Sequence, residues 1–143
     1  MRYILSRMTC PSTSGSAAHI AEAFVARKRF GGGMRQSGIV AAAALHGLEH
    51  HLARLAEDHA NARRLAATIA DGVRDVQVVP PDTNIVMIDL PARLDATTVT
   101  ARAKELGVAI SAWHDKRVRV VCHLDGSAGQ VDEAARAMVQ ALR

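Results

Sequence analysis

The chain has 143 residues, of which 49% are apolar and only 3% aromatic, so its core must be built from alanine, valine, leucine and isoleucine. A chain of about this length can bury roughly 70% of its unfolded surface, which suffices for one domain-sized core. The net charge of +4 permits an acidic ligand but is too small to indicate nucleic-acid binding. Two cysteines without a CxxC spacing predict reduced thiols and a cytoplasmic protein.

The first segment, residues 1–14, contains serine and arginine but no acidic residue. It has no apolar stretch long enough for a secretory signal, and no part of the chain has the ~18 consecutive apolar residues of a membrane span. We therefore leave 1–14 unassigned, expect it to be disordered, and expect no membrane partner. The next segment, 15–38, is predicted to hold a short amphipathic helix that carries Ile20 and Phe24 and ends at a glycine-rich turn.

That turn combines glycines with cations, since residues 27–38 read RKRFGGGMRQSG. Glycines allow a tight turn and a close approach to a ligand, and the N-terminus of a following helix favours an anion. One interpretation is a phosphate or carboxylate site at the start of the next helix. The other is a flexible hinge with solvated charges, and the pattern alone does not decide between them.

A long apolar stripe follows and predicts one helix over about 36–70, with a stop at Gly72. Such a helix is about 50 Å long, which is typical of an element that links two domains or packs against a partner. We assign 39–73 to this linking helix. His46 and His50 have the i, i+4 spacing of metal ligands but lack the glutamate of a zinc-protease motif, so we expect a solvated or interface face and no metal. The stripe consists of Leu45, Leu48, Leu52, Leu55, Ala62, Ile69 and Val73.

The remainder, 74–143, changes to short strands alternating with helices. We predict strands at 76–79, 84–90, 108–110 and 117–122, and helices at 95–106 and from about 127 to 142. This order predicts the α+β class: a long helix followed by a small sheet of about three to four mostly antiparallel strands, with helices on one face.

One strand residue could bind a ligand. In residues 117–122, side chains alternate between the two faces of the sheet, so Val118 and Val120 point to the core and Arg119 points away from it. An arginine in this position can hold a carboxylate with its planar fork. The alternative is an ordinary exposed strand arginine.

Four motifs together resemble the C-terminal part of low-specificity L-threonine aldolases. They are the turn 28–38 above, LAEDHANA at 55–62, TNIV at 83–86 and RVVCHLD at 119–125. The resemblance implies the small domain of the aspartate-aminotransferase fold and an enzyme dependent on pyridoxal phosphate. The activity it implies is retro-aldol cleavage of L-threonine or a related β-hydroxy amino acid to glycine and an aldehyde.

The resemblance also assigns roles to particular residues. Arg119 matches the arginine that holds the carboxylate of the amino-acid substrate, and Lys28 and Arg35 match basic residues near the cofactor phosphate and the subunit interface. The lysine that binds the cofactor covalently belongs to a large domain, and neither Lys104 nor Lys116 has its Ser-Lys-Gly setting.

We therefore expect no catalytic residue in this chain, no covalent cofactor, and a truncated protein that is inactive alone. Expected partners are a large domain or a second copy. The alternative function is a non-catalytic interaction or dimerisation module. Nucleic-acid binding through the basic turn is disfavoured because few aromatic side chains are available to stack on bases.

Overall fold

The structure, a computed structural model, describes residues 15–143, so the expectation for residues 1–14 lies outside the described part. The chain divides into two compact units, which within the described residues are 15–52 and Ala53–Arg143.

The first unit contains two helices, α1 (Ala17–Arg29) and α2 (Gly38–His50). Ser16 caps α1 by accepting a hydrogen bond from the His19 N–H, and basic residues fill its last turn, where they complement the helix dipole. Neither helix contains a buried residue. Most residues of α2 are apolar, and several of its large apolar side chains are exposed.

The predicted single helix over 36–70 is wrong in one respect. A 3₁₀ turn, η1 (Leu52–Arg54), separates α2 from the next α-helix, α3 (Leu55–Gly72). A 3₁₀ turn has 3.0 residues per turn, so an apolar spacing of three and four residues continues through it without interruption. The sequence pattern therefore cannot reveal the break.

The second unit contains a four-stranded sheet in the order β1-β2-β4-β3, with every neighbouring pair antiparallel. The strands are β1 (Gln77–Val79), β2 (Ile85–Asp89), β3 (Ser111–His114) and β4 (Arg117–Val121). A two-residue turn joins β3 to β4. The central pair, β2 and β4, aligns Val86 with Val120 and Ile88 with Val118.

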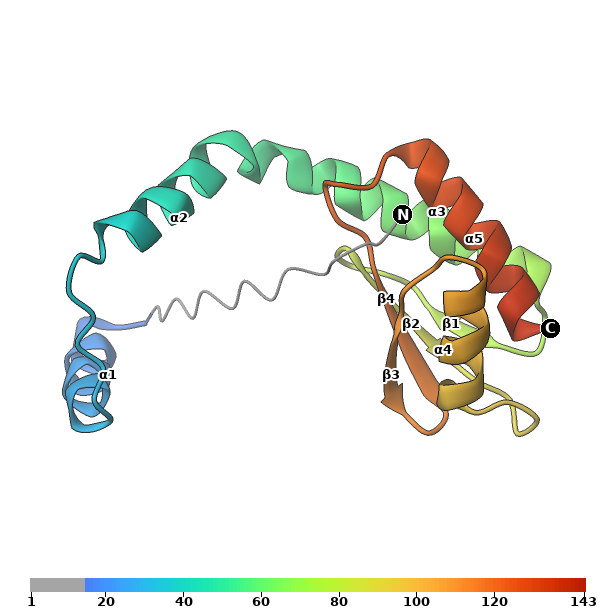
Figure 1. The fold of residues 1–143 in the computed structure, drawn as a ribbon, viewed down its shortest axis with the longest axis horizontal. Helices are drawn as coiled ribbons and strands as arrows, with labels where there is room; N and C mark the ends of the chain where they lie inside the picture. The colour runs from blue at the N-terminus through green and yellow to red at the C-terminus, as the bar shows by residue number, and fades with distance from the viewer. Residues whose placement is uncertain (1–14) are drawn as a thin grey trace. The chain divides into compact units, whose positions relative to one another are not determined.

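Three helices cover one face of this sheet: α3, α4 (Ala96–Glu105) and α5 (Ala128–Leu142) (Figure 1). The central strands bury alternate residues against them, and each fully buried aliphatic side chain contributes roughly 1.5–3 kcal/mol. The opposite sheet face is not covered by a helix of this unit, and it carries the other half of each strand's side chains. The largest buried side chains are Leu65, Ile69, Val86, Ile88, Val99, Val118, Met138 and Leu142.

The strand predicted at 108–110 is displaced, since β3 begins at Ser111. Gly107 has a φ of +85° and ends α4, and the Val108 N–H still donates to the Ala103 carbonyl of that helix. Val108 and Ile110 pack against the core without pairing to a strand. The apolar residues at 108–110 were therefore a sign of burial, and strand pairing begins only at Ser111.

The fold class is otherwise confirmed as α+β, with an antiparallel sheet and helices on one face. Among the helices that the structure describes, none combines the length and the apolar character needed to cross a membrane.

Candidate functional site

Arg119 lies in the middle of β4, on the sheet face that the helices leave uncovered. It is half-buried, and its neighbours across the two adjacent strands are Met87 on β2 and Ser111 on β3. Its Nε–H is buried and has no hydrogen-bond acceptor among the residues that the structure describes. A buried donor without an acceptor costs about 1–3 kcal/mol, so this group is suited to an added anion.

The neighbouring arginine on the same face has a partner. Arg117 donates from Nε and Nη2 to the two carboxylate oxygens of Asp89 on β2, with 2.8 Å between Nη2 and Oδ2. These hydrogen bonds, followed by the positive charge itself, hold the pKa of Asp89 below its ordinary value. Arg117 is thus neutralised within the sheet, whereas no carboxylate in residues 15–143 pairs with Arg119.

An aromatic side chain completes the surroundings of Arg119. The Cζ atom of Arg119 lies 4.9 Å from the ring centroid of Trp113, which is 50% exposed on β3. Sequence reasoning did not connect these two residues. The alternation across the short turn after His114 was a usable signal, because it brings β3 beside β4 with Trp113 on the face of Arg119.

Lys28 and Arg35 are exposed and belong to the first unit, whereas Arg119 belongs to the second. Lys28 is in the last turn of α1, with its Nζ 5.9 Å from the ring centroid of Phe24. Arg35 is in the segment between α1 and α2. Their predicted role at a cofactor site remains a prediction.

Two glycines of the basic turn, Gly31 and Gly32, lie in the turn that ends α1. Gly31 has a φ of +80°, and the Gly32 N–H donates to the Arg27 carbonyl at 2.8 Å. A Cβ on Gly32 would lie 2.6 Å from the side chain of Arg27, so this close approach requires glycine. These N–H groups are therefore used by the helix end. The first N–H groups of α2 are better placed for an anion, because no side chain caps them.

The histidines do not form a metal site in the described part of the chain. The rings of His46 and His50 stack with 4.1 Å between centroids, and His51 lies 5.5 Å from His46. No group of three or more metal-binding side chains is arranged to hold an ion within residues 15–143.

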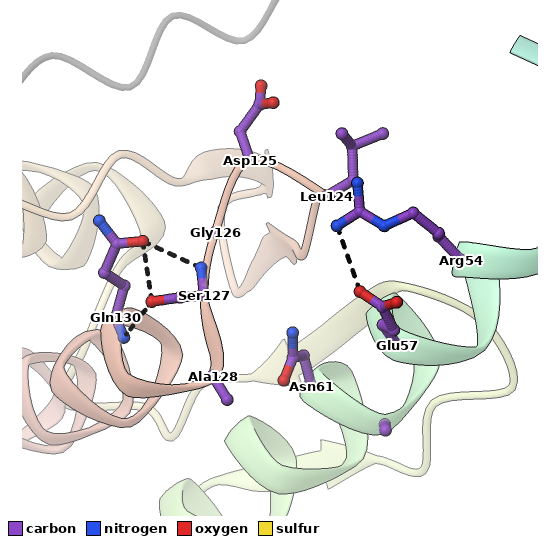
Figure 2. Close-up of a pocket in the computed structure, with 10 residues that line it drawn as sticks. Arg54, Glu57, Asn61, Leu124, Asp125, Gly126, Ser127, Ala128 and Gln130 are labelled. Carbon is purple, nitrogen blue, oxygen red and sulfur yellow. Dashed lines mark hydrogen bonds and ion pairs between the residues drawn. The ribbon is translucent and has the colours of Figure 1, made fainter. Parts of the chain in front are cut away.

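A pocket of about 570 Å³ lies between the start of α3 and the loop from β4 to α5 (Figure 2). Four of its charged and polar residues already have partners: Arg54 pairs with Glu57 at 3.2 Å, and Ser127 and Gln130 form the capping box of α5. None of Arg119, Lys28 and Arg35 lines it. The pocket is therefore separate from the residues that sequence reasoning selected.

Residues 13–93 match the beta-eliminating lyase family, and the chain belongs to that family. Three of its relatives carry the same kind of name. The chain is 39% identical over 121 residues to the low specificity L-threonine aldolase of Escherichia coli strain K12, covering 85% of this chain and 35% of that protein. It is 36% identical to low-specificity L-threonine aldolase 1 of Arabidopsis thaliana (76% and 31%) and 37% identical to that plant's probable low-specificity L-threonine aldolase 2 (76% and 32%).

The fold has a counterpart among solved structures. The α-aminoadipate aminotransferase LysN of Thermus thermophilus, complexed with N-(5'-phosphopyridoxyl)-L-leucine, aligns with a TM-score of 0.51 at 20% identity, over 72% of this chain and 29% of LysN. The small domain of an aminotransferase-like fold is thereby confirmed. The chain spans about a third of the length of the curated relatives it matches.

The family is dependent on pyridoxal phosphate, and the lysines of this chain do not fit a covalent site for it. Lys116 donates from Nζ to the carbonyls of Ala92 and Leu94, at 3.0 and 2.6 Å, and so holds a loop. Lys104 is exposed near the end of α4, and Lys28 lies beside Phe24 on α1. None of the three lines the pocket of Figure 2.

Proposed function

We propose that the chain supplies the carboxylate-binding part of an L-threonine aldolase active site and does not cleave threonine by itself. The observation that supports this most directly is the contrast between the two arginines of β4. Arg117 is neutralised by Asp89, whereas Arg119 keeps an unsatisfied Nε–H on the uncovered sheet face. The names of the relatives support the choice of substrate class, a β-hydroxy amino acid such as L-threonine.

Arg119 would bind the carboxylate of the amino-acid substrate and thereby orient the substrate. A planar guanidinium can donate two parallel hydrogen bonds to a carboxylate, which fixes the direction of the rest of the amino acid. Orientation of this kind matters in a cleavage reaction because the bond to be broken must be held at a defined angle to the group that activates it. No residue of this chain is assigned a catalytic role.

The proposal is tested with pyridoxal phosphate and borohydride. The purified chain is incubated with the cofactor, reduced, and digested, and the peptides are searched by mass spectrometry for a phosphopyridoxyl-lysine adduct while glycine release from L-threonine is followed. We expect no specific adduct and no glycine. Labelling of one lysine together with turnover would show that the chain is an aldolase on its own.

We also propose that the first unit is covered by a large domain or a second copy in the functional assembly, with 39–73 as the linking segment. The apolar residues of α2 support this, since Ile39 is 78% and Leu48 62% exposed. Sedimentation velocity over a range of concentrations tests self-association, and Leu48→Glu is the matched variant. A monomer at every concentration that also fails to bind an added full-length aldolase would contradict the proposal.

The roles of Lys28 and Arg35 at the cofactor edge are part of the same proposal, as is a cytoplasmic location. The assigned roles of Lys28 and Arg35 are supported by the position of both residues within the family match. They are tested by titrating inorganic phosphate into the chain and following the backbone NMR signals. We expect shifts at the start of α2 that Arg35→Ala weakens, and unchanged spectra would count against it.

The second candidate function is a non-catalytic interaction or dimerisation module. The same exposed surface of α2 favours it, because large exposed apolar patches are typical of surfaces that bind another protein. Carboxylate binding at Arg119 distinguishes the two, since only the first candidate requires it.

A further inference from the structure

Trp113 occupies an irregular position in the sheet. Ser111 pairs with Arg119 and Ala112 with Val118, but the next pair joins His114 to Arg117, so Trp113 is the extra residue of a β-bulge. Bulges occur frequently next to functional sites, where they redirect a side chain. Here the bulge leaves the indole of Trp113 on the uncovered face, with half of its surface exposed.

The indole and the Arg119 guanidinium are in contact. With 4.9 Å between Cζ and the ring centroid, the cation lies within the range of a cation–π interaction. Such a contact holds the flat face of a guanidinium and leaves its N–H edge available, which is the edge that binds a carboxylate. The residues that flank Arg119 on the adjacent strands, Met87 and Ser111, carry no aromatic ring.

We propose that Trp113 is a positioning residue for Arg119: its ring fixes the plane of the guanidinium, and thereby the plane in which a substrate carboxylate is bound. This inference rests on the proposed function of Arg119 as the carboxylate site. It deepens that function by adding a residue that acts through Arg119 without donating a hydrogen bond to the substrate. An immobilised guanidinium loses less side-chain freedom when the ligand binds, so the ring raises affinity.

The stack itself is tested without a ligand. Trp113 is the only tryptophan of the chain, so tryptophan emission reports on this position alone. We expect Arg119→Ala to increase quenching by acrylamide, because the guanidinium no longer covers the ring. The exposed Arg102 of α4 provides the matched control, and Arg102→Ala leaves the quenching unchanged. Equal quenching in all three proteins would overturn the inference.

The chemical shifts of the Arg119 side chain provide a second measurement, and a general loss of stability does not change them. We expect the ring current of the indole to shift the Arg119 side-chain protons upfield. We expect Trp113→Leu to abolish this shift and Trp113→Phe to retain part of it, with the backbone spectrum of β1 and β2 unchanged. An Arg119 resonance that is insensitive to Trp113→Leu would also overturn the inference.

Acetate and L-threonine are then titrated into the chain while the Arg119 side-chain resonances are followed. We expect Trp113→Leu to weaken binding between about 2-fold and 30-fold, and Trp113→Phe to restore most of it. Arg119→Ala, followed through the neighbouring backbone signals, removes binding. Arg119-dependent binding that Trp113→Leu leaves unchanged overturns the inference and leaves the proposed function intact. Binding that survives Arg119→Ala, or no binding to the wild-type chain, overturns both.

Discussion

Asp89 and Arg117 lie directly opposite each other on β2 and β4 and join the two central strands by paired hydrogen bonds on the uncovered face. The hydrogen bonds from Arg117 are the largest cause of the lowered pKa of Asp89. A carboxyl whose pKa is lower in the folded than in the unfolded chain contributes stability above its unfolded pKa of about 3.9. That contribution is lost as the pH falls through the lower, folded pKa.

We therefore predict that the free energy of unfolding decreases from about pH 5 downward, and that Asp89→Asn makes this decrease shallower. Denaturant titrations at several pH values measure both. Asp75 and Asp95 also have lowered pKa values, caused first by hydrogen bonds from Arg93 and Thr98, so some pH dependence persists in the variant. A slope that is identical in the two proteins would contradict the role of this pair.

The helix end at Gly72 predicts an overpacking effect. A Cβ on Gly72 would lie 2.6 and 2.8 Å from the two Cγ atoms of Val139 on α5. Valine is stiff at χ1, so Gly72→Ala should lower stability by about 1–3 kcal/mol, which exceeds the gain in helix propensity of up to about 1 kcal/mol. Gly129→Ala on α5 is the control, because its Cβ would meet nothing within 4 Å. Denaturation midpoints should move in opposite directions for the two variants.

The cap of α4 gives a third prediction. Asp95 accepts hydrogen bonds from the backbone N–H and the hydroxyl of Thr98, at 2.8 and 2.7 Å. Asp95→Ala should cost about 1 kcal/mol, whereas Asp95→Asn keeps an acceptor for the N–H and should cost less. Equal losses in the two variants would show that the charge, rather than the cap, stabilises the helix.

Cys122 should be slow to react. Burial, assisted by the negative charge of Asp58, raises the pKa of its thiol to about 11. At about pH 8 only roughly one thiol in a thousand is then ionised, compared with about a quarter in an unfolded chain. In a Cys10→Ser background, iodoacetamide should label the native protein far more slowly than the urea-unfolded one. Comparable rates would mean that Cys122 is accessible in the native state.

Much of the second unit could be predicted from the sequence because its signals are local. Asp95 and Ser127 cap helices, Gly107 ends one, and alternation placed Val118 and Arg119 on opposite faces of β4. The displaced strand β3 shows the limit of such signals. Apolar residues are favoured both in buried loops and in paired strands, so their periodicity does not show at which residue strand pairing begins.

The candidate site divides in the same way. Arg119 was accessible to sequence reasoning through the alternation of β4 and through the family motifs. Trp113 was missed, because its place beside Arg119 depends on the pairing of β3 with β4, and this strand was predicted at 108–110 instead of at Ser111–His114. The joint role of Arg119 with Lys28 and Arg35 stays a prediction, since these residues belong to different units.

The sequence by itself determined the family, the α+β class and the identity of the candidate binding arginine, because these depend on residue types at short spacings. Only the tertiary structure decided which arginine of β4 is neutralised and which is left for a ligand. That distinction arises from strand register: β2 brings Asp89 opposite Arg117 and Met87 opposite Arg119. Register is a long-range property, and no pattern within β4 alone encodes it.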